Sequence, residues 1–160
     1  FAIGESKALK MLSLNHRVYV MLGDGELQEG EIWEGAMFSA HHQLDNLCAI
    51  VDYNKMQSDD LNENIMGLEP LVDKWSSFGW NVIEIDGHSF QQMEEAFNNA
   101  RKVKSMPSVI VAHTIKGKGV SFMENSPTWH GSVKLSDSDF KQALFELGAT
   151  ENEIGEIINE

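Results

Sequence analysis

An α/β fold, in which helices flank a parallel sheet, is the architecture that this sequence predicts. Short apolar runs of strand length alternate along the chain with longer segments of helical periodicity. Several of the runs stop abruptly at glycine or asparagine, as strands do where they enter a loop. Strands joined through helices pair in parallel, and right-handed crossovers place ligand-binding residues at the carboxyl ends of those strands.

The amino-terminal half holds the first two predicted strands. Residues 17–22 form a short buried run that ends at Gly23-Asp24-Gly25. Apolar residues fall at helical spacing over residues 31–44, and residues 47–53 form a second buried run. Residues 54–69 are polar and irregular, so we expect a loop there.

The alternation resumes after this loop. Further elements are predicted as a helix over residues 70–78 that ends near Gly79, a strand over 80–86 closed by Gly87, an amphipathic helix over 90–104 and a strand over 108–114. The glycine-punctuated loop Lys116-Gly117-Lys118-Gly119 follows. Ser136 with Asp139 resembles a capping box that starts another helix, and Thr150 with Glu153 can start a last short one.

Length and composition fit one domain over residues 1–160. Phe1 opens directly on a helical pattern, as if the protein began upstream. The net charge of −13 argues against binding to nucleic acid or to an anionic membrane, which needs a basic face. No apolar run has the length of a bilayer span. Cys48 stands alone within an apolar run, which fits a buried residue and a reducing, cytoplasmic location.

Asp24 and Asn54 are the residues whose placement predicts chemistry. Each follows a predicted strand, and one β-α-β unit separates them, so both side chains can converge at the same end of the sheet. A carboxylate with an amide oxygen is a hard ligand set that suits Mg²⁺ or Ca²⁺. Gly25 lets the backbone approach a phosphate. A simple Gly-Asp-Gly turn is the alternative for this segment taken alone.

Residues 23–59, GDGELQEGEIWEGAMFSAHHQLDNLCAIVDYNKMQSD, resemble the transketolase family of thiamine diphosphate enzymes. The later segment TIKGKGVSFMENSPTWHG, residues 114–131, is similar to the same family. The resemblance is to the amino-terminal subunit of split bacterial or archaeal transketolases. It implies a thiamine diphosphate-binding fold, of which this chain is the diphosphate-binding domain.

The resemblance implies a set of cofactor residues at the start of the chain. Asp24, the Asn54 side chain and the Met56 carbonyl would ligate Mg²⁺, for which Ca²⁺ or Mn²⁺ can substitute. The cation would bridge to the diphosphate, and the cofactor-binding segment would comprise Gly23, Asp24, Gly25 and Glu26. Glu29 would join an acidic network between two active sites, a role compatible with a helix-start carboxylate that interacts with the helix dipole.

For each of the candidate residues later in the chain, a functional and a structural interpretation are both open. His130 resembles the family histidine that reaches the cofactor phosphate or the substrate, and is otherwise a loop histidine. Lys116 and Lys118 lie in a basic, glycine-rich loop that suits an anion, or are solvated. Ile115 packs on the cofactor ring or in the core. In one departure from the family, Gln57-Ser58-Asp59-Asp60 ends in aspartate where glycine is usual.

The family's pyrimidine-binding domain, whose glutamate activates the cofactor, has no counterpart in this chain. The resemblance therefore implies sugar phosphate substrates and a hetero-oligomer with a dimeric core, completed by a complementary carboxyl-terminal subunit. A 1-deoxyxylulose-5-phosphate synthase or a specialised sugar or sulfosugar transketolase is the nearest alternative. A non-catalytic interaction module is the alternative from another class. A Mg²⁺-nucleotide binder would need a P-loop or GxGxxG turn, and the sequence has neither.

Overall fold

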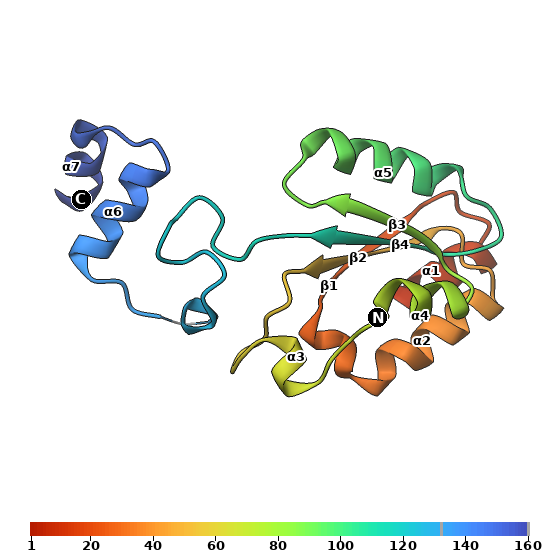
Figure 1. The fold of residues 1–160 in the computed structure, drawn as a ribbon. Coiled ribbons are helices and arrows are strands. Elements are labelled where there is room, and N and C mark those ends of the chain that lie inside the picture. Colours follow the sequence, from red (N-terminus) through yellow and green to blue (C-terminus); the bar gives the residue numbers. More distant parts are fainter. Residues whose placement is uncertain (132, 160) are drawn as a thin grey trace. The chain divides into compact units, whose positions relative to one another are not determined.

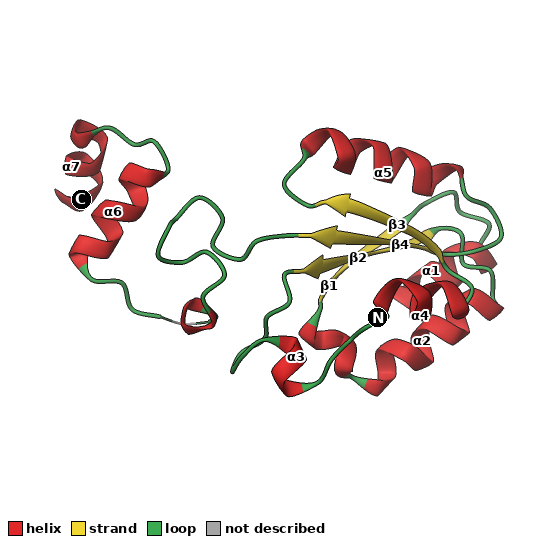
Figure 2. Cartoon of the chain, viewed as in Figure 1, coloured by secondary structure: helices red, strands yellow, loops and turns green. Residues whose placement is uncertain are grey.

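The computed structural model describes residues 1–131 and 133–159, and it confirms the predicted α/β architecture (Figure 1). The elements, coloured by type in Figure 2, are α1 (Ala2–Met11), β1 (Val18–Gly23), the 3₁₀ helix η1 (Gly25–Gln28), α2 (Gly30–His41), β2 (Leu47–Tyr53), α3 (Asn62–Ile65), α4 (Leu71–Ser77), β3 (Asn81–Asp86), α5 (Phe90–Lys102), β4 (Ser108–His113), the 3₁₀ helix η2 (Pro127–Trp129), α6 (Asp137–Glu146) and α7 (Glu151–Asn159). Within the described residues, no helix combines the length and the apolar character needed to cross a membrane.

The four strands form one sheet in the order β1-β2-β4-β3, and every pairing is parallel. Gly23 at the end of β1 lies opposite Asp52 of β2, and Tyr53 lies opposite His113 of β4. Asp86 at the end of β3 lies opposite His113 as well. All four carboxyl ends therefore meet at one edge of the sheet, and the loops that follow them can form a common site.

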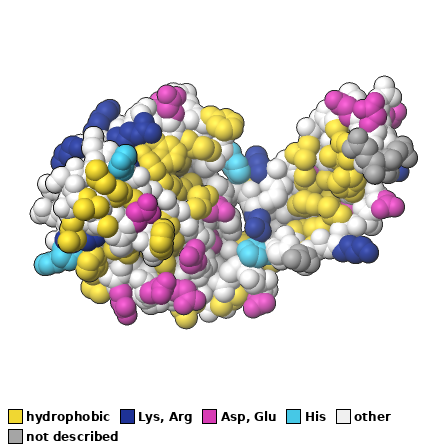
Figure 3. Space-filling model, turned by 180° about the vertical axis from the view of Figure 1, so that it is seen from behind, with side chains coloured by type: hydrophobic (Ala, Val, Ile, Leu, Met, Phe, Trp, Pro, Cys, Tyr) yellow, Lys and Arg dark blue, Asp and Glu magenta, His cyan; other side chains and the backbone are white. Residues whose placement is uncertain are grey.

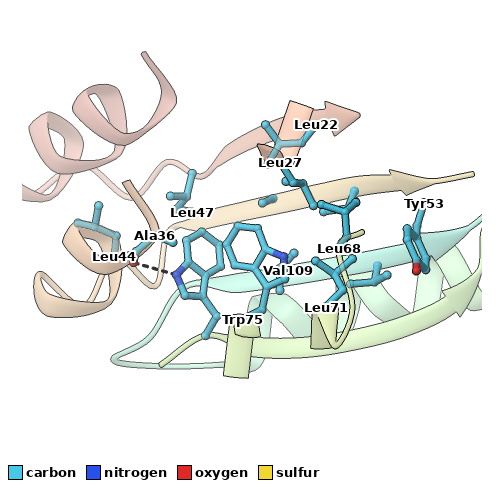
Figure 4. Packing of buried hydrophobic residues seen from close by; sticks show 14 of the residues in the cluster. Leu22, Leu27, Ala36, Leu44, Leu47, Tyr53, Leu68, Leu71, Trp75 and Val109 are labelled. Atoms are coloured by element: carbon cyan, nitrogen blue, oxygen red, sulfur yellow. Dashed lines mark hydrogen bonds between the residues drawn. The ribbon is translucent and has the colours of Figure 1, made fainter. Parts of the chain in front are cut away.

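Helices cover both faces of the sheet, as Figure 1 shows. One face packs against α1, α2 and α4 in a cluster of leucines, valines and tryptophans, seen from close by in Figure 4. Trp75 is almost fully buried there, and the Trp80 indole N–H donates to the Ala36 carbonyl at 3.0 Å. The other face packs against α5 through Cys48, Ile110 and their neighbours. Burying one large apolar side chain stabilises the fold by roughly 1.5–3 kcal/mol, so both layers stabilise the sheet.

Several predicted boundaries differ from the structure. Helix α2 ends at His41 rather than at residue 44, because Gln43 adopts a left-handed φ of 49°. The short helix α3 lies within the stretch that the sequence predicts to be irregular. Helix α5 ends at Lys102 rather than at residue 104, where Val103 turns to extended backbone. The predicted capping box of Ser136 and Asp139 is present at the start of α6.

The chain divides into two compact units. The first comprises residues 1–55 and 62–114 and contains the whole sheet. The second comprises residues 56–61 and the chain from Ile115 onward, with α6 and α7. The second unit exposes Val133, Phe145, Leu147 and Ile157, and Figure 3 shows hydrophobic side chains gathered on it.

Candidate metal and diphosphate site

Asp24 lies directly after β1, with only 1% of its surface exposed. Its Oδ1 accepts a hydrogen bond from the Gly25 N–H at 2.7 Å, and its Oδ2 accepts one from the Lys55 N–H at 2.5 Å. The second bond joins the end of β1 to the loop that follows β2. The carboxylate is thus fixed against the peptide that links Asn54 to Lys55, as the sequence spacing predicts.

The electrostatics of Asp24 favour a cation. Burial raises the pKa of the Asp24 carboxyl, and the charge of Asp52 raises it further, while the Asn62 side chain and the N–H groups of Lys55 and Gly25 oppose the rise. Within residues 1–131 and 133–159, Asp24 forms no ion pair. A buried carboxylate without a cationic partner is costly, and a bound divalent cation would remove that cost.

Asn54 is held by Asp52. The Asn54 Nδ2 donates to Asp52 Oδ2 at 3.1 Å, and the Thr114 hydroxyl donates to Asp52 Oδ1 in a short hydrogen bond. Thr114 follows β4, and its backbone N–H donates to the Tyr53 carbonyl at 3.3 Å. The ends of β2 and β4 are therefore joined by a polar network that includes a predicted metal ligand.

The backbone at Lys55 has a conformation that this site requires. Lys55 has a φ of 67°, in the left-handed region that few residues other than glycine adopt. This turn directs its N–H to Asp24, while its carbonyl accepts from the Asn62 N–H at 2.9 Å. Asn62 is buried at the start of α3. The short helix that the sequence did not predict thus supports the loop that carries Asn54.

The Gly23-Asp24-Gly25 segment forms a tight turn into η1. The Gly23 N–H donates to Glu26 Oε2 at 3.0 Å, and Glu26 itself is exposed. Leu27 is fully buried below the turn, and its carbonyl accepts from the Trp33 indole at 2.7 Å. Glu29 is the N-cap residue of α2, without a side-chain capping bond. The core therefore positions this segment by packing, and Glu29 stays a proposed residue of the acidic network.

Four predicted site residues belong to the second unit. Met56 is buried and pairs with Leu61 in an isolated antiparallel bridge. Ile115 and Lys116 are half-buried, and His130 follows η2 with its side chain half-buried. Their roles in binding the metal, the cofactor or the substrate stay predictions. The described part of the chain holds no cluster of three or more histidine, cysteine, aspartate or glutamate side chains arranged for a metal.

Outside the site, the expectation that Cys48 is a buried residue is confirmed. Cys48 is fully buried, and burial raises the pKa of its thiol to about 11, so it is a core residue. His113 ends β4, where its ring lies 3.0 Å from Glu84 and packs edge-on against Tyr53. The Tyr53 hydroxyl donates to Glu69, and this bond lowers the pKa of the Glu69 carboxyl.

Sequence reasoning missed Asp52, Thr114, Asn62 and the Lys55 backbone. One signal was present for Asp52, because a carboxylate at the end of an apolar strand, two positions before Asn54, lies on the same face as that residue. Thr114 ends the run predicted as a strand over residues 108–114, which placed it at the same edge of the sheet, whereas nothing local to residue 62 indicates contact with this site.

The residues at this site fit the Mg²⁺ ion and the diphosphate that the resemblance to transketolases implies. A buried carboxylate and an amide held with its nitrogen toward Asp52 together offer oxygen ligands, which suit Mg²⁺ better than a transition metal. Such a cation keeps open positions for phosphate oxygens.

Comparisons with known proteins give the family. Residues 8–160 match the family model described as "Transketolase, thiamine diphosphate binding domain". The chain is 45% identical over 146 residues to the 6-deoxy-6-sulfo-D-fructose transketolase subunit SqwG of Clostridium sp. (strain MSTE9), covering 91% of this chain and 53% of that protein. It is 37% identical to one of the subunits of the apulose-4-phosphate transketolase of Phocaeicola vulgatus, covering 91% and 51%.

Solved structures of transketolases have the same fold as this chain. The transketolase of Campylobacter jejuni superposes with a TM-score of 0.85 at 28% identity, over 92% of this chain and 24% of that one. The chain thus spans about half the length of the two curated relatives named above and a smaller part of this transketolase. Sequence and fold agree on one assignment: this chain belongs to the transketolase family and represents its thiamine diphosphate-binding domain.

Proposed function

We propose that this chain is the metal- and diphosphate-binding part of a transketolase, which transfers a two-carbon ketol unit from a ketose phosphate to an aldose phosphate. The observation that carries this proposal is the buried Asp24 carboxylate, which lacks an ion pair among the described residues and lies against the loop of Asn54. Thiamine diphosphate supplies the carbon nucleophile for such a transfer. The chain's own residues bind and orient it.

The proposed roles of the individual residues follow from their positions after the strand ends. Asp24, Asn54 and the Met56 carbonyl hold Mg²⁺, and Gly23 to Glu26 form the turn beside the diphosphate. The Gly25 N–H is already engaged by Asp24, so in this arrangement it fixes the ligand carboxylate. Lys116 and Ile115 contact the cofactor, and His130 reaches the substrate or the phosphate. Glu29 joins the acidic network between two sites.

A complementary subunit is part of this proposal. Both relatives described above are named as transketolase subunits, and the chain covers about half of each. We infer that the pyrimidine-binding domain comes from a partner, and that the isolated chain binds the cofactor weakly. Isothermal titration calorimetry tests this point, and micromolar affinity of the isolated chain for thiamine diphosphate and Mg²⁺ would refute it.

A specialised sugar substrate is the second candidate. The relative that is 45% identical is named for a sulfonated ketose, and the one that is 37% identical for apulose 4-phosphate. The discriminating assay supplies the assembled protein with xylulose 5-phosphate, 6-deoxy-6-sulfofructose or apulose 4-phosphate in separate reactions, with one aldose phosphate acceptor. The donor with the highest kcat/KM identifies the specificity.

The site itself is tested by Asp24→Ala in the assembled protein. Loss of a direct metal ligand should weaken Mg²⁺-dependent cofactor binding by more than the roughly 10–100-fold that follows loss of a ligand's supporting partner. Asp86→Ala is the matched control, because Asp86 is an exposed carboxylate at the end of β3 whose Oδ1 accepts from the His88 N–H of the same turn. Unchanged cofactor affinity in Asp24→Ala would show that the site is assigned wrongly.

A further inference from the structure

Asp52 contacts both Asn54 and Thr114 but is not one of the predicted metal ligands. Its two carboxylate oxygens are divided between them, with Oδ2 accepting from the Asn54 amide and Oδ1 from the Thr114 hydroxyl. Asp52, Asn54 and Thr114 continue the alternation of the sheet face that α5 covers. The three side chains thus form one network at the carboxyl ends of β2 and β4.

The chemistry of this network fixes the orientation of the Asn54 amide. A carboxylate can only accept hydrogen bonds, so the donating Nδ2 of Asn54 must face Asp52. The carbonyl oxygen of the same amide then points away from Asp52. Without Asp52, this bond would no longer keep the nitrogen, which cannot ligate a cation, on the side away from the carbonyl oxygen's position.

Thr114 restrains Asp52 from a different strand. Its hydroxyl donates to the carboxylate, and its backbone N–H bonds the Tyr53 carbonyl at 3.3 Å, so the threonine is anchored to β2 at two points. Its methyl group fills space left by Gly87, where a Cβ would lie 2.4 Å from Thr114 Cγ2. The ends of β2, β3 and β4 therefore all determine where the Asp52 carboxylate lies.

We propose that Asp52 is a positioning residue for the metal site: it presents the Asn54 carbonyl oxygen to the cation, and Thr114 holds it in that orientation. This inference rests on the proposed function, since it assumes that Asn54 ligates Mg²⁺. Partners of metal ligands generally change metal affinity by about 10–100-fold when they are removed.

The test measures the apparent Kd for Mg²⁺ in the assembled protein at a fixed concentration of thiamine diphosphate, by calorimetry, with Mn²⁺ and electron paramagnetic resonance as a second probe. Asp52→Ala should raise this Kd about 10–100-fold. Thr114→Val, which keeps the size and every charge but loses the hydroxyl, should raise it several-fold. Thr114→Ser, which keeps the hydroxyl, should have the apparent Kd for Mg²⁺ of the wild type. At saturating Mg²⁺ the variants should regain wild-type cofactor affinity.

The outcomes distinguish failure of the proposed function from failure of the positioning role. If the wild-type protein shows no Mg²⁺-dependent cofactor binding, the proposed function fails, and this inference fails with it. If the wild type binds and Asp24→Ala does not, but Thr114→Val and Asp52→Ala bind Mg²⁺ as the wild type does, only the positioning role is refuted. If Asp52→Ala weakens binding while Thr114→Val does not, Asp52 acts through its charge, which also refutes positioning. Asp86→Asn serves as the control and should bind normally.

Discussion

Gly87→Ala is the substitution whose effect follows most directly from the structure. The added Cβ would lie 2.4 Å from Thr114 Cγ2 and 3.2 Å from both Ala112 Cβ and the His113 carbonyl oxygen. The first of these distances is too short for any real contact, so Thr114 must move. Its hydroxyl bonds Asp52, so a rotation that removes the methyl group from the clash would also break that bond.

The magnitude follows from two opposed contributions. Overfilling a packed site costs about 1–3 kcal/mol, whereas replacing glycine with alanine in a compatible backbone gains about 0.4–1 kcal/mol. We therefore expect Gly87→Ala to lower the free energy of unfolding by about 1–2 kcal/mol. Urea denaturation followed by tryptophan fluorescence measures this change.

A double variant isolates the cause. Thr114→Ser removes the clashing methyl group and keeps the hydroxyl, so it should cost only about 0.8 kcal/mol alone. Combined with Gly87→Ala, it should abolish most of the penalty, which gives a favourable coupling of about 1–2 kcal/mol between the two sites. Gly4→Ala, in an open position of α1, is the control and should stabilise slightly. A stable Gly87→Ala variant, or a double variant as unstable as the sum of the single ones, would refute the contact.

Three further predictions concern side chains that are not among the predicted metal ligands. Tyr53→Phe should destabilise the fold by about 1 kcal/mol at pH 7, because it removes a hydrogen bond to the solvent-exposed Glu69 carboxylate. Because folding lowers the pKa of Glu69, this stabilisation is fully present above pH 4.5, the ordinary pKa of the group, and is lost as the pH falls through the pKa in the folded state. The variant and the wild type should therefore become equally stable in acid. A stability difference that does not change with pH would contradict this. Cys48, with its pKa raised to about 11, should react with a thiol reagent only after unfolding, and rapid labelling of the native chain would show that it is accessible. Ser136→Ala should cost about 1 kcal/mol by removing the capping box with Asp139, and hydrogen exchange should accelerate at the start of α6 but not at α5.

The features of the fold that the sequence predicted correctly depend on residues that are close together in the chain. The run at residues 47–53 is uniformly apolar up to Asp52, and β2 has the predicted bounds. The capping box at Ser136 was visible because its partners are three residues apart. The end of α2 was overestimated, since Leu44 continues the helical spacing although the backbone has already turned at Gln43. The spacing of apolar residues predicts which of them lie on the same face of a helix, but it does not predict the residue at which the helix ends.

The sequence by itself determined the fold class, the placement of Asp24 and Asn54 after two successive strands of one β-α-β unit, and the family, because strand ends and a long specific motif are local features of the chain. Only the tertiary structure decided what surrounds those two residues. The Lys55 N–H reaches Asp24, and Thr114 reaches Asp52, because parallel pairing brings the ends of separate strands to one edge. Such contacts join positions about thirty to sixty residues apart, and a hydrogen bond between them depends on sheet order and register, which no local pattern specifies.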